Sequence, residues 1–487
     1  MISKIQITPA EFRVAAVIVA MAMSSQAAEF SLESARDAEE AGWAQMDKIL
    51  DRIQPPVFPD HSVGIADFGG VGDGETDNRK AIAKAIDSVS QKGGKIVFPE
   101  GDYFVDGPIH LKSNIHLHLE KGSRIFFSSK AESYLPAVKV RWEGTMCYNY
   151  SPLIYGNGLK NIAITGEGVI DGNAVKWSKT WRNKQKPDKA VLRQMGNDTI
   201  PDEQRVFGNG FLDLDGDGKD DGYGDGNPHY LRPCLFEVHE CENVLLEGLT
   251  LKDSPFWTIH PVFSKNIIIR NLNVRGGTLN DDGIDPDSCE DVLIEGCTVK
   301  TRDDAISIKA GRDQDAWKRP PIRNIIVRNN RLQANTNAFC IGSEMSGGVE
   351  NVFVEKNVII NARFAVNFKC NLDRGGQVQR VYIRELDIES CRDNMILFTM
   401  DYHSHRGNDF PTKFNDFYIS DIRCRTVEKK PFEIVGVEEA PIRRMFLSDI
   451  QIDSAGAAST LKHAKDIVAD RVTIAGRVFE PEHRDPG

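Results

Sequence analysis

Apolar and polar residues alternate in short runs that recur along most of the chain. Three clear copies cover residues 243–251, 266–274 and 291–299, and each begins with Asn or Asp. From residue 243 onward the copies begin 22 to 36 residues apart, and further copies start at Asn324, Asn351, Arg380, Asp416, Arg444 and Asp466, with earlier ones at Asn114 and Asn161. Such alternation is typical of strands with one buried face, so the pattern predicts many short β-strands.

The repeat length decides between two all-β architectures. A β-propeller blade needs about 40–45 residues and four strands, which is more than these steps provide. A solenoid needs only one turn of strands per repeat, and β-branched residues suit its stacked parallel strands. We therefore expect one single-stranded parallel β-helix with an N-terminal helical cap, and a ladder of Asn side chains at the bend where the repeats begin.

The segments before the repeats have a different pattern. Apolar residues at helical spacing predict a helix over residues 31–53. A second helix is expected from Arg79 to Ser90, with Asp77 or Asn78 as its cap.

These patterns predict one helical segment and one β-helix that contains an insertion, although a length of 487 residues alone would suggest about three globular domains. Residues 29–60 form an N-terminal helical segment, and residues 61–487 form the β-helix. Residues 175–232 are polar, rich in Lys, Asp and Gly, and interrupt the repeats. A long insertion in a solenoid commonly lies on one face and is often functional.

Residues 1–28 have the three parts of an export signal. Lys4 and Arg13 precede an apolar stretch at 14–23, and the small residues at 25–27 provide a cleavage site. We therefore expect a mature chain that is secreted or periplasmic.

The nine cysteines all follow this signal. Cys234 and Cys241, and likewise Cys289 and Cys297, are near enough in sequence to be bridged in an oxidising compartment. The interpretation that we favour is that most cysteines are small buried apolar residues. There is no Cys-x-x-Cys pair, which argues against structural zinc.

Composition excludes two classes of partner. The formal net charge is −11, which disfavours nucleic acid because phosphate binding requires a basic surface. No apolar run after the N-terminus reaches the ~18 residues of a membrane span. We expect a soluble monomer.

Two consecutive repeats end in clusters of aspartates. Asp282 lies 21 residues before Asp303, close to one turn of the expected solenoid, and Asp304 follows directly. One turn brings residues side by side, so we expect these carboxylates to share a site. Crowded like charges raise at least one pKa and so provide a proton donor beside an acceptor. Hydrolysis of a glycosidic bond requires this pair, although a solvated or calcium-binding acidic face remains an alternative.

Several motifs together resemble one family. Residues 68–74 resemble the opening of pectin-active β-helix proteins, and residues 166–172, 254–261 and 282–288 resemble polygalacturonases of glycoside hydrolase family 28. Residues 303–309 and 341–348 are similar to its exo-acting bacterial members. The resemblance covers about residues 65–450 and implies a right-handed parallel β-helix that hydrolyses galacturonides with inversion, without a cofactor for the chemistry.

The resemblance also implies catalytic roles. Asp282 and Asp304 would activate water, and Asp303 would protonate the leaving oxygen. Asn280 begins the matching Asn-Thr-Asp segment, in which Asp281 replaces the family's Thr.

Two departures concern substrate recognition. Asn337 stands where the family has His, and Asn367 stands where it has the Arg of an Arg-Ile-Lys motif, of which Lys369 remains. Loss of an Arg that grips a carboxylate in bidentate fashion makes rhamnogalacturonan, a substituted galacturonide, or another acidic or sulfated galactan fit as well as plain polygalacturonate.

The resulting set of candidate residues has a catalytic, a substrate-binding and a metal-binding part. The catalytic candidates are Asp282, Asp303 and Asp304. The candidate substrate contacts are Asn280, His260, Lys309, Arg312, Asn337 and Lys369. Alternating acids resemble a calcium loop and suggest a structural calcium site at Asp213, Asp215, Asp217 and Asp221.

The prediction from these residues is an exported, exo-acting glycoside hydrolase on a pectin-like polysaccharide or oligosaccharide. Exo action is favoured by the resemblance of residues 341–344 and by an insertion long enough to block one end of a cleft. A polysaccharide lyase on the same scaffold and a non-catalytic carbohydrate-binding β-helix are the alternatives.

Overall fold

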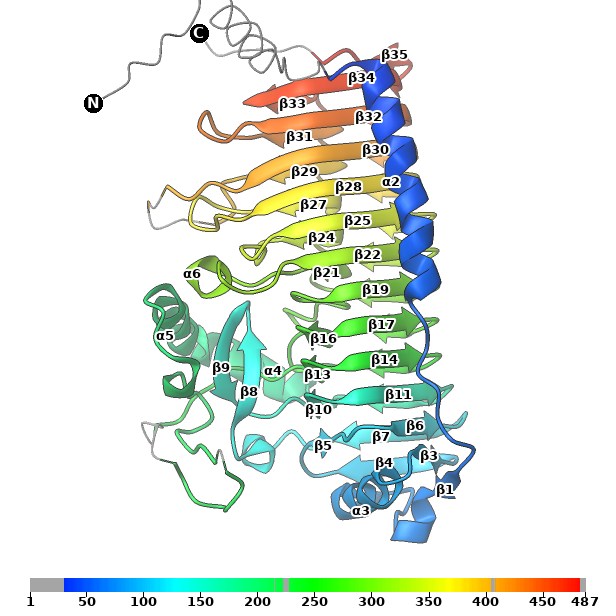
Figure 1. The fold of residues 1–487 in the computed structure, drawn as a ribbon, viewed down its shortest axis with the longest axis vertical. Helices are drawn as coiled ribbons and strands as arrows, with labels where there is room; N and C mark the ends of the chain where they lie inside the picture. Colours follow the sequence, from blue (N-terminus) through cyan, green and yellow to red (C-terminus); the bar gives the residue numbers. More distant parts are fainter. Residues whose placement is uncertain (1–29, 214, 222–226, 404–406, 408, 482–487) are drawn as a thin grey trace, which may run out of the picture.

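The computed structural model describes residues 30–213, 215–221, 227–403, 407 and 409–481. In this part of the chain the strands stack turn upon turn along one long axis (Figure 1). Almost every strand pairs in parallel with the strand one turn before and the strand one turn after it. The predicted parallel β-helix is therefore confirmed.

The wide sheet bends around two faces of the solenoid. Its strands run in two rows that merge at β28, where single long strands begin to span both faces. The described residues give it 23 strands: β1 (Ser62–Gly64), β2 (Asp73–Asp77), β3 (Gly94–Phe98), β4 (Gly101–Val105), β6 (Ile115–Leu119), β7 (Ser123–Phe127), β11 (Lys160–Gly166), β12 (Val169–Asp171), β14 (Glu242–Glu247), β15 (Thr250–Lys252), β17 (Lys265–Arg270), β18 (Asn273–Arg275), β19 (Glu290–Glu295), β20 (Thr298–Thr301), β22 (Ile322–Arg328), β23 (Arg331–Ala334), β25 (Val349–Glu355), β26 (Val358–Asn361), β28 (Gln377–Cys391), β30 (Lys413–Val427), β32 (Ile442–Ala455), β34 (Ala464–Ile474) and β35 (Arg477–Val478).

The third face is formed by two shorter sheets in line with each other. The first contains β5 (Ile109–His110), β10 (Ile154–Asn157), β13 (Phe236–His239) and β16 (Ile259–Val262), and the second contains β21 (Ile306–Ile308), β24 (Asn337–Gly342), β27 (Phe364–Lys369), β29 (Ile396–Thr399), β31 (Phe432–Val435) and β33 (Thr460–Lys462). Between them, Ile284 bridges Ile259 on one side and Ile306 on the other. Residues 282–287 thus continue the face across the gap.

A ladder of polar side chains runs along one bend, as predicted. Asn161 donates to Asn114, Asn243 to Asn161, and Asn266 to Asn243, each over 2.8–2.9 Å. The ladder continues from Asn351 to Asn324 at 3.0 Å. These residues all have positive φ, which Asn tolerates better than most side chains. The repeated Asn therefore has a structural role at the bend.

Two helices cover different parts of the solenoid. Helix α3 (Arg79–Ser90) spans the predicted residues and covers the first turn with an apolar face. Asn78 is its N-cap residue, without a capping side-chain bond, and Oδ1 of the preceding Asp77 accepts from the N–H of Arg79 at 3.0 Å. Helix α2 (Leu32–Arg52), in the predicted N-terminal segment, lies instead along the outside of the wide sheet (Figure 1).

Helix α2 packs on a single ladder of outward-facing apolar residues. The apolar residues that cluster with α2 and with the segment after it occupy one register position in successive turns: Ala163, Leu245, Ile268, Leu293, Ile326, Phe353, Tyr382, Tyr418 and Phe446. Trp43, Met46 and Ile49 are the buried large residues of the helix. Residues on the outward, solvated face of a sheet are normally polar. The apolar residues of this ladder are therefore exceptional, and they explain why the helix docks on the side of the solenoid.

The predicted insertion contributes helices beside the third face. Between β12 and β13 the described residues contain α4 (Val175–Lys184), α5 (Lys186–Asn197) and the short 3₁₀ helix η3 (Asp202–Gln204). These helices lie next to the antiparallel hairpin of β8 (Val138–Trp142) and β9 (Thr145–Asn149) (Figure 1). Two further 3₁₀ helices, η1 (Ile65–Phe68) and η2 (Ala131–Tyr134), and helix α6 (Asp313–Ala316) complete the described elements.

Other sequence predictions have mixed outcomes. All nine cysteines are buried and none is bridged, so the favoured interpretation is confirmed. The predicted signal at 1–28 lies outside the described residues. Among the described helices, none combines the length and apolar character that crossing a membrane requires.

The packing of α2 and its helix propensity predict opposite effects of Gly42→Ala on the free energy of unfolding. A Cβ added at Gly42 would lie 2.0 Å from Cε1 of Tyr382, and that ring is stacked between Phe353 and Tyr418. Propensity alone would make Gly42→Ala more stable by about 1 kcal/mol. We expect overpacking to lower the free energy of unfolding by about 1–3 kcal/mol instead, measured by urea denaturation.

The control is Ala41→Gly, at an exposed position of the same helix. It loses propensity without touching the sheet, so it should lower stability by no more than about 1 kcal/mol. A stabilised Gly42→Ala variant would contradict the packing of α2.

Candidate active site

The three predicted catalytic aspartates come together on the third face. Asp282 lies in the segment that joins β18 to β19, and Asp303 and Asp304 lie between β20 and β21. The Gly283 N–H donates to the carbonyl of Asp304 at 2.9 Å, which stacks one turn on the other. One carboxylate oxygen from each aspartate lies within 4.8 Å of those of the other two. The spacing of 21 residues was therefore a correct guide to proximity.

The aspartates line a cavity of about 340 Å³. One wall comes from the solenoid and the opposite wall from the insertion and the turn between β8 and β9. The lining side chains are Glu143, Lys189, Arg193, Trp257, Asn280, Asp282, Asp303, Asp304, Lys309, Arg312, Ser343, Glu344, Lys369, Tyr402 and His403. The cavity is thus crowded with charges of both signs.

Asp304 is the most completely bonded of the three carboxylates. Its Oδ2 lies 2.6 Å from Nζ of Lys369 and 3.2 Å from Sγ of Cys340, which donates to it. Its Oδ1 accepts from Oγ1 of Thr336 at 2.6 Å and from Nδ2 of Asn337 at 2.5 Å. Burial works against ionisation, but Lys369 and Lys309 outweigh it and hold the pKa of Asp304 below its ordinary value. Asp304 is therefore the ionised member of the group.

Asp303 has the opposite tendency. Burial raises its pKa, and the neighbouring charge of Asp304 raises it further. Its side-chain contacts lie at 3.2 Å to Oγ1 of Thr336 and 3.4 Å to Nδ2 of Asn280, and it has no contact as short as the 2.5–2.6 Å bonds of Asp304. With two carboxylates pushed apart in pKa, one can hold a proton while the other accepts one.

Asp282 faces the same cavity and is also buried. Burial raises its pKa first, followed by the charges of Asp303 and Asp285, while Lys309 at 3.8 Å opposes the shift. A proton on Asp303 removes the negative charge that raises the pKa of Asp282. The three carboxylates therefore titrate as one linked set.

Asp281 stands where the family has Thr, and its side chain holds the backbone beside Asp303. Its Oδ1 accepts from the N–H groups of Arg302 and Asp303 at 2.9 and 2.8 Å, and its Oδ2 from Thr278 at 3.2 Å. Burial raises its pKa to about 6, although these N–H groups oppose the shift. Nothing in the sequence alone indicated this contact.

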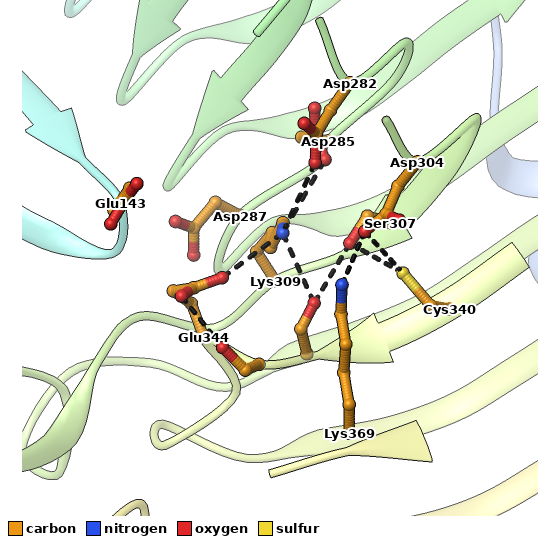
Figure 2. A network of polar contacts seen from close by, with 12 residues as sticks. Glu143, Asp282, Asp285, Asp287, Asp304, Ser307, Lys309, Cys340, Glu344 and Lys369 are labelled. Carbon is orange, nitrogen blue, oxygen red and sulfur yellow. Dashed lines mark hydrogen bonds and ion pairs between the residues drawn. The ribbon is translucent and has the colours of Figure 1, made fainter. Parts of the chain in front are cut away.

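A buried row of ion pairs lies under the cavity (Figure 2). Nζ of Lys309 lies 3.2 Å from Glu344 and 3.9 Å from Asp285, and Nη2 of Arg312 lies 2.7 Å from Glu344. Burial raises the pKa of Asp285 to about 8, with Lys309 opposing. Lys309 and Lys369 thus balance the negative charge of the aspartates from within the protein.

Four of the six predicted substrate contacts line the cavity: Asn280, Lys309, Arg312 and Lys369. The expectation for His260 needs correction, because it is 0% exposed and does not line the cavity. Its ring lies 3.3 Å from Glu237 and 3.5 Å from Asp287, and against the opposing effect of burial these acids raise its pKa to about 9. The histidine is a buried structural cation.

Asn337 is the second correction, because it also lies outside the lining of the cavity. Its amide bonds Asp304, and its Oδ1 accepts from Nδ2 of Asn367 at 2.8 Å. The two departures from the family's motifs therefore contact each other. Asn367 therefore bonds Asn337, which in turn bonds the carboxylate of Asp304.

The candidate calcium loop is only partly assembled. Asp213, Asp215 and Asp221 place ligand oxygens within 4.8 Å of one another. Asp217 lies outside this group and pairs with Lys219 at 2.8 Å. Oxygens of Asp213 also accept from the N–H groups of Gly216 and Gly218. Calcium binding here stays a prediction.

Comparisons with known proteins agree with this geometry. The model of glycosyl hydrolases family 28 matches residues 192–471, which is more than half of the chain. The chain belongs to glycosyl hydrolases family 28. A second model, of the rhamnogalacturonase A/epimerase, pectate lyase-like group, matches residues 62–120. The resemblance identified in the sequence is confirmed.

Relatives within family 28 include both plant and bacterial proteins. A probable polygalacturonase of Vitis vinifera is 30% identical over 72% of this chain and 66% of its own length. An exo-poly-α-D-galacturonosidase of Dickeya chrysanthemi is 26% identical over 77% of this chain and 64% of its own length. The chain thus spans slightly less than two thirds of these relatives.

A solved structure matches more completely. The hyperthermoactive exopolygalacturonase of Thermotoga maritima is 34% identical, with a TM-score of 0.81, and the match covers 88% of this chain and 96% of that chain. Both chains share the right-handed parallel β-helix.

The bond between Lys369 and Asp304 predicts a pH-dependent loss of stability. In Lys369→Met, Asp304 would be a buried carboxylate without its cation, which costs about 3–5 kcal/mol. The lowered pKa of Asp304 stabilises the wild type above the unfolded pKa of about 3.9. We therefore expect the deficit to be largest near neutral pH and to shrink as the pH falls toward 4, as measured by denaturant unfolding.

The double variant Lys369→Met/Asp304→Asn is the matched control. It removes the unpaired charge, so it should recover much of the stability and lose the pH dependence. A deficit that is the same at every pH would mean that Asp304 does not rely on Lys369 for its charge.

Proposed function

We propose that the protein is an exported, exo-acting galacturonide hydrolase that works by inverting acid/base catalysis. The observation that carries the proposal is the division of the aspartates into an ionised Asp304 and an Asp303 whose pKa is raised. A donor beside an acceptor at the same pH is what glycosidic hydrolysis requires. The substrate class is supported by the names of the relatives in family 28.

Each aspartate has one role in this proposal. Asp303 protonates the leaving glycosidic oxygen as its bond to the anomeric carbon breaks. Asp282 and Asp304 face the attacking water, and Asp304, the ionised member, accepts its proton while Asp282 helps to position it. Lys369 keeps Asp304 ionised, so that it can accept a proton at a pH where Asp303 still carries one.

Inversion is supported by the family resemblance and not by the distance between the carboxyl groups. The carboxyl groups of most inverting glycosidases lie about 6.5–9.5 Å apart, whereas here the nearest oxygens lie within 4.8 Å. Export is supported only by the sequence of residues 1–28. Exo action is supported by helix α5 and the β8–β9 turn, which contribute Lys189, Arg193 and Glu143 to one wall of the cavity.

The role of Asp303 predicts a loss of chemistry without a loss of fold. Asp303→Asn can neither donate nor accept a proton at this position, so we expect kcat on oligogalacturonates to fall by about 10²–10⁴. Asp37→Asn, at an exposed position of α2, removes the same charge far from the cavity and should retain full activity. Retention of activity in Asp303→Asn would disprove the assignment.

The proposal also predicts the first product. Hydrolysis of trigalacturonate should release saturated galacturonate monomer and digalacturonate, seen by mass spectrometry. Inversion at an α linkage should give the β anomer first, seen by NMR within the first minutes. An α anomer would contradict inversion, internal cleavage of longer chains would contradict exo action, and unsaturated products would identify a lyase.

A further inference from the structure

The cations that line the cavity differ in their freedom to contact a substrate. Three side chains are nearly inaccessible: Lys309 is 2% exposed, Lys369 5% and Arg312 8%. Each of these also bonds a buried acid of the protein. Lys189 and Arg193 are instead 29% and 35% exposed, so they are the lining cations that present surface to the cavity.

Both accessible cations come from the insertion. They lie four residues apart on helix α5, where positions i and i+4 share one face. Nζ of Lys189 lies 2.8 Å from Oε1 of Glu143, and Nη2 of Arg193 lies 2.6 Å from Oε2. Glu143 sits on the β8–β9 turn, across from the buried row of ion pairs (Figure 2). Helix and turn therefore fix the two cations at the rim of the cavity.

Lys189 and Arg193 have charge and hydrogen-bond donors left for a second anion besides Glu143. Although burial opposes ionisation, Lys189, Arg193 and Arg312 hold the pKa of Glu143 at about 2, so one negative charge faces two positive charges of α5. A Lys has three N–H donors and an Arg has five, of which Glu143 uses one from each residue. Within the described residues, Nε of Arg193 is a buried donor without a hydrogen-bond partner, so the capacity open to a substrate lies in the exposed part of the two side chains.

The position at which the family has an Arg does not provide a cation for the substrate carboxylate, because Asn367 occupies it. Asn367 is 2% exposed, bonds Asn337 and does not line the cavity. Lys369, the retained part of that motif, is bonded to Asp304. A carboxylate on the substrate would therefore find its accessible counter-charge on the insertion wall.

We propose that Lys189 and Arg193 bind the carboxylate of the uronate at the chain end that enters the cavity. This inference rests on the proposed function and adds that the free acid at the chain end is recognised by the insertion. The same helix that closes the cavity would then select the uronate.

The test compares an acid with its ester in single and double variants. Arg193→Gln and Lys189→Gln should each raise KM for trigalacturonate by about 10- to 100-fold, the range for a hydrogen bond to a charged group. The double variant should show a larger loss, and kcat should change much less than KM. For fully methyl-esterified trigalacturonate, kcat/KM should change by less than about threefold, so the preference for the acid collapses.

The control is Lys179→Gln, an exposed cation on helix α4 of the same insertion, which should keep the wild-type preference. Equal losses on acid and ester would assign the pair a purely structural role and overturn the proposal. An unchanged KM for the acid would overturn it as well.

A binding measurement separates this inference from the proposed function. Calorimetry with D-galacturonate and D-galactose should give tighter binding of the acid to the wild type, and this difference should vanish in the double variant. If the wild type cleaves no galacturonide, the proposed function fails whatever the variants do. If it cleaves them and the variants keep both the KM and the acid-over-galactose preference, only the present inference fails.

Discussion

The structure depends on one constraint, which is the in-register stacking of parallel turns. Stacking places residues about one repeat apart in direct contact, whatever their chemistry. At the bend it aligns Asn side chains into a ladder, and outside the wide sheet it aligns the apolar row under α2. On the third face it aligns acids, so that Asp282 meets Asp303 and Asp304. The same stacking that forms the fold therefore brings the charged residues of the site together.

Stacked acids carry an energetic cost, and buried lysines offset it. Charges removed from water are tolerated when they are paired and hydrogen-bonded. Lys369 bonds Asp304 and Lys309 lies among Glu344, Asp282 and Asp285. Because Lys369 contacts Asp304 and not Asp303, the two neighbouring aspartates differ in pKa. The asymmetry of this cation placement is what turns a cluster of like charges into a donor and an acceptor.

Much of this could be predicted from periodicity, and the rest could not for identifiable reasons. Spacing by one turn predicted the solenoid, the Asn ladder and the meeting of the aspartates. The same logic would have paired Asn337 with Asn367, which are 30 residues apart. Burial of His260 was missed because it points outward, opposite to the core residue Ile259, and is covered by the β8–β9 hairpin. Arg141 of that hairpin bonds Glu237 and Asp287, the two acids beside His260, and the sequence does not show that the hairpin folds over this position. The position of Lys189 and Arg193 at the cavity was missed because the insertion has no repeat, so nothing in its sequence indicates what it faces.

The proposed acid/base division requires that Asp303 hold a proton while Asp304 does not. Neutron diffraction of deuterated crystals about one pH unit above the ordinary aspartate pKa of about 3.9 observes this directly. We predict nuclear density for one deuterium on a carboxylate oxygen of Asp303, none on either oxygen of Asp304, and three on Nζ of Lys369. Deuterium on Asp304, or a bare Asp303, would contradict the assignment of donor and acceptor.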